Sequence, residues 1–222
     1  MLVGAVVLRL TVTDTYRRYV QPGMGKWLLI AGILVMAIGA FTLVQSLRNA
    51  DLEEGHGHDH DGSHKVGVGW LLLAPIAALL LVAPPTLGAY GVDRAASVNI
   101  TQGKSTFKRL PKNAPPRSMT LLEYVQRSFD HNGASLNGAQ IQLTGFVAGA
   151  EPGGFRLARY QIACCAADAT PVVVDIAGTS GTTPAKDDWV TVTGTFRRGG
   201  GEVPRLAATT VAETSAPEDP YE

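Results

Sequence analysis

Two long uncharged apolar runs are the feature that most limits how this chain can fold. Trp27–Val44 is the first, and Val66–Val92 is the second, rich in leucine. Each is close to the length needed to cross a hydrocarbon core about 30 Å thick. A buried helix of a soluble protein can contain one such run. Two runs in a chain of 222 residues favour membrane spans, which we expect at about 27–45 and 66–90.

A third apolar stretch, Met1–Val12, is too short to span a membrane alone and carries Arg9. It lacks the basic start and the small-residue cleavage site of a signal peptide. Two interpretations stay open: a partly inserted segment, or the second half of a first spanning helix that starts upstream. We favour the second. We therefore assign residues 1–92 to a membrane region with a partial first span at about 1–13.

The connections between the apolar stretches differ in charge. The connection before Trp27 holds three basic residues against Asp14, whereas the one after Val44 holds five acidic residues. The chain from Arg94 to Arg117 contains no acidic residue. The apolar runs predict a multi-pass protein of the cell membrane. The positive-inside rule places the C-terminal domain in the cytoplasm and the acidic connection outside.

The loop at 51–65, between the two long runs, is rich in histidine and acid. Its candidate metal ligands are His56, His58, His60, His64, Asp59 and Asp61. Imidazole and carboxylate together suit zinc best, and the interleaved glycines allow the backbone to wrap around an ion. The spacing is not that of a fixed structural site, so we expect loose binding of zinc or another divalent transition metal. The alternative is a solvated loop without a ligand.

The C-terminal half changes character. Residues 93–117 read as a basic, proline-rich linker suited to anionic membrane lipid, and residues 118–222 as a soluble domain. A capping box at Thr120–Glu123 predicts a short helix that runs to about Asp130. Period-two patterns then predict five strands, at about 141–147, 155–164, 171–176, 189–196 and 205–211. Short strands interrupted by Gly145 and Gly194 favour a small all-β barrel of the oligonucleotide/oligosaccharide-binding (OB-like) type. A flat β-sandwich is the alternative.

Both cysteines of the chain are adjacent, Cys164 and Cys165, and Asp168 follows closely. Neighbouring side chains of a strand point to opposite faces, so the two thiols share one site only if the strand bulges. Cys165 and Asp168 converge if Ala166–Ala167 forms a tight turn. These three residues have three candidate roles: metal binding by thiolate and carboxylate, thiol redox chemistry, and thiol-based sensing. Redox catalysis is disfavoured because there is no Cys-x-x-Cys pair and no flanking basic residue. The structural alternative is a small buried Cys164 and a turn capped by Asp168.

The sequence gives little support to nucleic-acid binding or catalysis. The formal net charge is zero, and the arginines of the domain lack an interleaved aromatic pattern. The soluble domain offers one histidine, His131, and neither a nucleophile elbow nor a paired-carboxylate motif. We expect neither a nucleic-acid partner nor enzymatic activity.

Several features occur in an order that resembles a known family. They are the histidine-rich loop between apolar runs and the stretches Tyr19–Pro22, Cys164–Asp168, Asp187–Gly194 and Pro217–Tyr221. Together they resemble the YcgQ-like family of bacterial membrane proteins, described as permease subunits. The resemblance covers nearly the whole chain and implies a separate multi-span membrane permease as partner. It implies neither a substrate nor a mechanism.

These observations lead to two functional hypotheses. The first is a membrane-anchored accessory subunit of a permease that handles a divalent transition metal such as zinc. The alternative is a membrane-tethered OB-like module that recognises a protein or an oligomeric ligand without metal.

Overall fold

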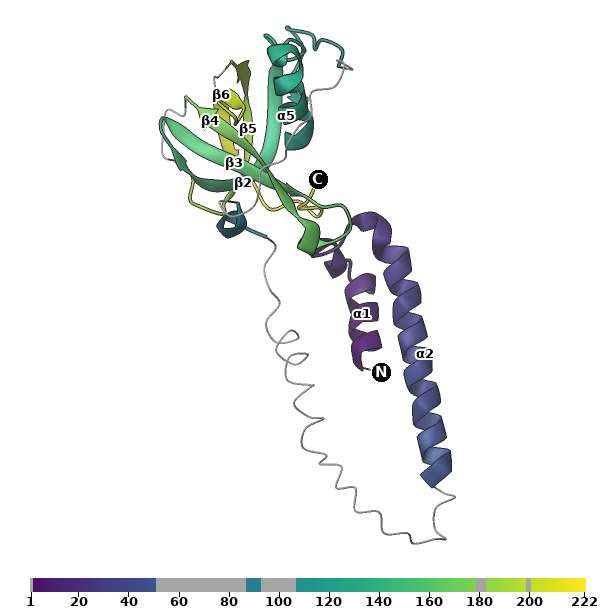
Figure 1. Cartoon of the computed structure of the whole chain (residues 1–222). Helices are drawn as coiled ribbons and strands as arrows, with labels where there is room; N and C mark the ends of the chain where they lie inside the picture. The colour runs from purple at the N-terminus through teal and green to yellow at the C-terminus, as the bar shows by residue number, and fades with distance from the viewer. Residues whose placement is uncertain (1, 51–86, 93–106, 179–182, 199–200) are drawn as a thin grey trace. The chain divides into compact units, whose positions relative to one another are not determined.

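The computed structural model describes residues 2–50, 87–92, 107–178, 183–198 and 201–222 (Figure 1). The chain divides into two compact units. One consists of Met1–Tyr16 with Gly23–Thr86, and the other of Arg17–Pro22 with Leu87–Glu222. The second unit therefore takes in a short segment that precedes the long apolar helix in the sequence.

The described residues of the first unit contain two helices, α1 (Leu2–Val12) and α2 (Gly25–Ala50). The 3₁₀ turns η1 (Thr15–Arg18) and η2 (Pro22–Met24) lie between them in the sequence. The two helices pack through small residues. A Cβ atom on Gly4 would lie 2.7 Å from the Met36 Cγ atom, so glycine lets the backbones approach.

One helix among the described residues, Pro22–Arg48, is long and apolar enough to cross a membrane. Length and composition alone would also fit a signal sequence or the core helix of a soluble protein. The stretch Leu2–Val12 is shorter. Most of the second predicted span lies outside the described residues, so a multi-pass arrangement stays a prediction. The end of that predicted span needs correction, because Leu87–Val92 belongs to the second unit.

Helix α5 (Leu121–Phe129) opens the folded part of the C-terminal half. The Thr120 hydroxyl accepts the backbone N–H of Glu123 at 3.0 Å, so the predicted helix start is confirmed. The chain then leaves the helix through η4 (Asp130–Gly133). His131 and Asn132 both have positive φ there, a conformation that residues in turns can adopt.

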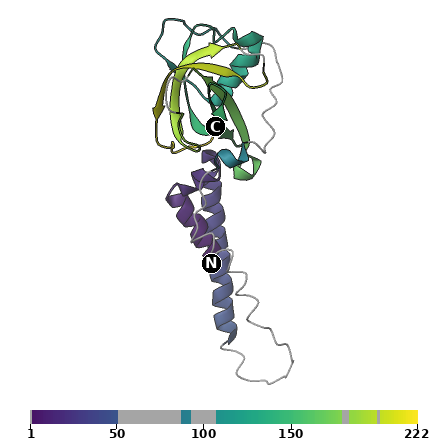
Figure 2. The ribbon, with the colours of Figure 1, turned by 90° about the vertical axis from the view of Figure 1, so that its left-hand side faces the viewer.

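The strands form one mixed sheet of six (Figures 1 and 2). They are β1 (Arg117–Ser118), β2 (Gln140–Glu151), β3 (Gly154–Gln161), β4 (Thr170–Ala177), β5 (Trp189–Arg197) and β6 (Arg205–Glu213). The five predicted strands are all present, whereas β1, which pairs in parallel with β2, was not predicted. The second predicted strand was too long, because β3 ends at Gln161.

The sheet order is β1-β2-β3-β4-β6-β5, and β2 also pairs with β5. The pairings therefore run from β2 through β3, β4, β6 and β5 back to β2. The β4–β6 pair is parallel, and the other pairs of this ring are antiparallel. The structure thus shows a mixed six-stranded sheet with a short helix. The prediction of a closed barrel is more specific than this description.

Two glycines allow strands to approach closely. A Cβ atom on Gly145 would lie 2.6 Å from the Ala158 carbonyl oxygen, and one on Gly194 would meet the Ala207 carbonyl oxygen. The β5–β6 register shifts between Thr193 and Gly194, which marks a bulge.

The two faces of β2 and β3 are buried by different parts of the chain. The inner face joins α5 in the main core, through residues such as Leu121, Leu143 and Phe155. The outer face carries a smaller cluster of Ala89, Val92, Phe146, Ala148, Ala158 and Tyr160. The period-two sequence pattern predicted that the inner face is buried. It did not predict that another segment of the chain buries the outer face.

The segment Leu87–Val92 covers this outer face and is held by side chains of β3 and of the turn before β5. Tyr160 donates its hydroxyl proton to the Gly88 carbonyl at 2.9 Å. Asp187 accepts the Ala89 N–H at 2.6 Å, and Ala89 is fully buried. The end of the second apolar run is therefore an integral part of the C-terminal unit.

The last residues of the predicted linker also pack on this unit. Leu110 is buried and donates its backbone N–H to the Ser135 carbonyl at 2.9 Å. The Arg127 guanidinium lies 4.5 Å from the centre of the Phe107 ring. The folded unit therefore starts before residue 118.

Candidate functional site

The two cysteines lie in the connection between β3 and β4, beyond the end of β3. The 3₁₀ turn η5 (Ala166–Asp168) follows them, and Cys165 has an extended backbone with φ −154° and ψ 171°. Because neither cysteine belongs to a strand, the alternation of side chains between faces does not separate them. The tight turn that the sequence argument required is present.

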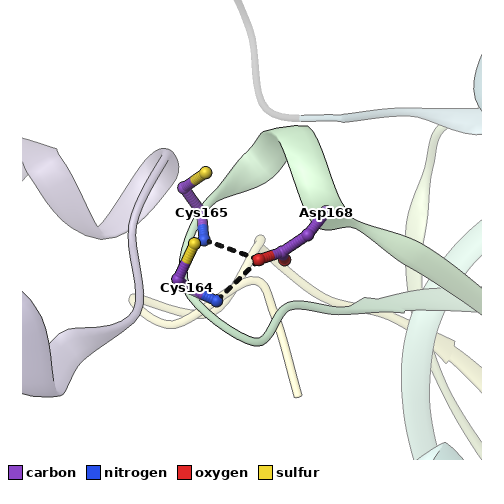
Figure 3. A group of neighbouring side chains, drawn as sticks. All are labelled: Cys164, Cys165 and Asp168. Carbon is purple, nitrogen blue, oxygen red and sulfur yellow. Dashed lines mark hydrogen bonds between the residues drawn. The ribbon is translucent and has the colours of Figure 1, made fainter.

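Asp168 organises this turn (Figure 3). Its Oδ1 atom accepts the backbone N–H of Ala163 at 2.9 Å. Its Oδ2 atom accepts the N–H groups of Cys164 at 2.8 Å and of Cys165 at 3.4 Å. The Asp168 backbone N–H in turn donates to the Cys165 carbonyl at 3.0 Å, within a capping-box arrangement of the two residues. One carboxylate therefore fixes the backbone of both thiol-bearing residues.

The same carboxylate controls the protonation of Cys164. A side-chain hydrogen bond between the Cys164 thiol and Asp168 raises the pKa of that thiol to about 12. This bond, with the Ala163 and Cys164 N–H groups, lowers the Asp168 pKa to about 2. At neutral pH the turn therefore holds an ionised carboxylate and a protonated Cys164. A protonated thiol is a poor nucleophile.

The three side chains form a compact donor set. The two sulfurs and a carboxylate oxygen all lie within 4.8 Å of one another. Cys164 is exposed, Cys165 is partly exposed and both are free thiols, so a solute can reach them. Among the described residues, this is the one group of three or more His, Cys, Asp or Glu side chains with metal-binding spacing.

A cation can enter this set by replacing protons. Asp168 already accepts hydrogen bonds from three backbone N–H groups and from the Cys164 thiol. When both thiols ionise and bind a cation, two protons leave to solvent. The carboxylate lone pair that accepted the Cys164 proton then becomes available to the ion. The turn can thus offer two thiolates and one carboxylate oxygen without giving up its backbone hydrogen bonds.

The segment Arg17–Pro22 pairs with this turn. Val20 and Cys165 form an antiparallel bridge. The Gln21 N–H donates to the Cys164 carbonyl at 3.1 Å, and the Ala166 N–H donates to the Tyr19 carbonyl at 2.7 Å. The backbone around Cys165 is therefore held by Asp168 and also by a segment more than a hundred residues earlier in the chain.

The C-terminal residues hold the same segment at its other end. The Arg17 guanidinium lies 3.4 Å from an Asp219 carboxylate oxygen. The Tyr221 hydroxyl donates to the Arg18 carbonyl at 2.6 Å. The tail itself is fixed by Arg159, which donates to the Asp219 carbonyl at 2.6 Å. Sequence reasoning missed these contacts. The stretches Tyr19–Pro22 and Pro217–Tyr221 were noted only as family features.

The predicted site residues thus divide into two sets. Cys164, Cys165 and Asp168 come together as described. The six candidate ligands of the loop at 51–65 lie outside the described residues. They are His56, His58, His60, His64, Asp59 and Asp61.

Comparison with known families now identifies the chain's relatives. Residues 1–95 match the DUF1980 N-terminal domain, and residues 119–222 match the DUF1980 C-terminal domain. The chain belongs to the DUF1980 family. The DUF1980 C-terminal domain contains the Cys164–Asp168 turn and the tail, whereas Arg17–Pro22 and Leu87–Val92 come from the DUF1980 N-terminal domain. The folded C-terminal unit therefore draws on both DUF1980 domains. Neither DUF1980 match carries the YcgQ name or a permease role. Comparison with curated proteins finds no match.

Proposed function

We propose that this protein is a membrane-anchored accessory subunit of a permease and that it handles a divalent transition metal such as zinc. The observation that carries the proposal is the group of Cys164, Cys165 and Asp168, whose ligand atoms lie within 4.8 Å of one another. Thiolate and carboxylate are both ligands of zinc, at about 2.3 Å and 2.0–2.2 Å respectively.

The form of this site favours transfer over permanent binding. Three protein ligands leave a fourth tetrahedral position open, as in zinc sites that exchange a ligand. Cys164 is exposed, so a partner can approach the ion directly. An accessory subunit that delivers an ion to a pore needs such an accessible and loosely held ligand set. The histidine loop at 51–65 would add a second loose ligand set in the same protein.

The membrane anchor in this proposal is α2. Arg17–Pro22 directly precedes its apolar stretch, and Leu87–Val92 follows residue 86. Both segments are hydrogen-bonded into one folded unit, which supports placing both on the same side of a membrane in this proposal. The chain between them would then cross an even number of times. If α2 is one crossing, the apolar run that starts at Val66 would be the other, ending before Leu87.

We further propose that the ring of strands closes as an OB-like barrel. The pairing of β2 with both β3 and β5 supports this, because a closed order leaves no free edge in the ring. The bulges between Val147 and Gly149 and between Thr193 and Gly194 supply the bending that closure needs. Basic residues before α5, such as Lys108, Arg109 and Lys112, would suit contact with anionic lipid.

Zinc titration of the purified full-length protein in detergent tests the metal proposal. We compare the wild type with two variants: Cys164→Ser with Cys165→Ser, and alanine at His56, His58, His60 and His64. Each variant should lose a separate part of the bound zinc. A wild type that takes up no zinc, or a double serine variant that binds as much as the wild type, would refute the role given to the cysteine pair.

Capture of the permease tests the partner proposal. Affinity purification from solubilised membranes should recover a multi-span membrane protein. If a different kind of partner stays bound after chelation and with Cys165→Ser, the alternative gains support. That alternative is a tethered OB-like module that binds a protein or oligomeric ligand without metal and without catalysis.

A further inference from the structure

We infer that Arg17–Pro22 is a working part of the Cys164–Asp168 site, so that metal binding to the two thiols and pairing of this segment strengthen each other. The inference rests on the proposed metal-binding function and adds a regulated element to it. The partner of the metal site is thus the segment of the chain that leads into α2.

The first step is the way the site backbone is held. Asp168 binds the N–H groups of Ala163, Cys164 and Cys165. Two further backbone groups beside Cys165 pair with the segment: the Cys164 carbonyl accepts from Gln21, and the Ala166 N–H donates to the Tyr19 carbonyl. Each peptide group beside Cys165 therefore has one hydrogen bond to Asp168 and a second one that the segment supplies.

The second step is what this fixing does for a ligand. Pairing with Val20 keeps Cys165 extended and holds its sulfur within 4.8 Å of the other two ligand atoms. Without the segment, the turn must lose backbone freedom when an ion binds, and that loss opposes binding. A thiophilic cation therefore binds the paired form more tightly than the unpaired form. By thermodynamic reciprocity, the bound cation stabilises the pairing by the same factor.

The third step is where the coupling leads. The segment is held at its start by Asp219 and Tyr221 and continues at Pro22 into the apolar helix. Loading of the thiols therefore changes how firmly the chain just before α2 is held. A protein that docks beside this helix can sense the change without touching the metal.

Hydrogen exchange in the full-length protein in detergent micelles tests the coupling directly, with Zn²⁺ as the probe. Zinc should slow exchange of the Gln21 and Ala166 amides by roughly fivefold or more, the lower end of usual coupling factors. The Tyr124 amide, which bonds to Thr120 within α5, serves as the control and should not change. The double variant Cys164→Ser with Cys165→Ser should abolish the response.

The reciprocal measurement uses a variant that loosens the segment without touching a ligand. Tyr221→Phe removes the hydroxyl that bonds to the Arg18 carbonyl. It should weaken zinc binding at the cysteine pair by a similar factor, as measured by competition with a chromophoric chelator. Tyr124→Phe is the matched control, because that hydroxyl bonds to the Arg205 carbonyl in the core. It should leave zinc affinity unchanged.

The outcomes separate this inference from the proposed function. If the cysteine pair binds zinc but the Gln21 and Ala166 amides exchange as before, the coupling is refuted and the metal site stands. If Tyr221→Phe speeds exchange of these amides and zinc affinity stays at the wild-type value, the coupling is refuted as well. If the wild type binds no zinc through its cysteines, the proposed function fails and the inference falls with it.

Discussion

The Tyr221 hydroxyl donates a hydrogen bond of 2.6 Å to the backbone carbonyl of Arg18, a residue 203 positions away. One side chain near the C-terminus therefore holds the segment Arg17–Pro22, which the DUF1980 N-terminal domain contributes to the C-terminal unit.

Tyr221→Phe tests this link. The variant keeps the ring and removes the hydrogen bond to Arg18, which is worth about 0.5–1.5 kcal/mol. We expect hydrogen exchange of the backbone amides of residues 17–22 to speed up roughly fivefold, while the strands exchange as in the wild type. In contrast, Tyr124→Phe should lower the melting temperature of the whole unit without a selective increase in exchange at residues 17–22. Unchanged exchange at these residues in Tyr221→Phe would contradict the proposed anchoring.

Asp168→Asn tests the electrostatics of the turn. The Asp168 hydrogen bond raises the Cys164 pKa to about 12 from an ordinary value of 9.0. Without the negative charge this pKa should fall, so more thiolate is present at pH 8.5 and alkylation by iodoacetamide speeds up. Each unit of pKa is worth about tenfold in thiolate, so we expect at least a tenfold increase.

Residue-resolved mass spectrometry of the alkylated peptide measures this rate. Asp188→Asn is the control, because Asp188 also accepts a backbone N–H, that of Ala185 at 2.9 Å, but forms no part of the cysteine turn. Equal alkylation rates at Cys164 in Asp168→Asn and wild type would show that Asp168 does not protect the thiol.

Glu222 makes folding stability depend on pH with the opposite sign to that expected for most carboxylates. Its side chain is only 2% exposed and accepts the N–H groups of Leu121 and Leu122 at 2.7 and 2.8 Å. Burial raises the Glu222 pKa, and these N–H groups and Arg159 offset the rise only in part. The folded unit therefore holds this proton more tightly than the unfolded chain does. Its contribution to stability is full below the unfolded value of about 4.3 and declines as pH rises through the folded pKa.

Glu222→Gln removes this contribution to the pH dependence. Melting temperatures measured from pH 4 to pH 7 should show the wild type losing stability relative to Glu222→Gln as pH rises. Glu213→Gln, at an exposed acid of β6, is the control and should track the wild type. A constant difference between wild type and Glu222→Gln across this range would count against the raised pKa.

Gly145→Ala tests the close approach of β2 and β3. The added methyl would lie 2.6 Å from the Ala158 carbonyl oxygen, so the strands must separate. Overpacking of this kind costs about 1–3 kcal/mol in the free energy of unfolding, which denaturant titration can measure. Gly149→Ala in the same strand is the control, because a Cβ there meets nothing within 4 Å. Similar stability losses for both alanines would mean that backbone freedom, and not contact, explains the cost.

Local patterns in the sequence were enough to predict most of the elements. Thr120 and Glu123 marked the start of α5 because a helix start needs a side-chain acceptor for its free N–H groups. Period-two apolar residues such as Ile141 and Leu143 marked the core face of β2, since a strand turns alternate side chains to the same face. The convergence of Cys165 with Asp168 also followed from a local turn of four residues.

The sequence by itself therefore determined the short-range structure of this protein. It was enough for the apolar helix α2, the helix α5, five strands and the turn at Cys164–Asp168. Only the tertiary structure placed Arg17–Pro22 against Cys164 and Ala166, covered Phe146 with Ala89, and brought Tyr221 to Arg18. The physical reason is that most of these contacts use backbone N–H and C=O groups. Every residue except proline carries both groups, so residue type cannot specify which distant partner they find.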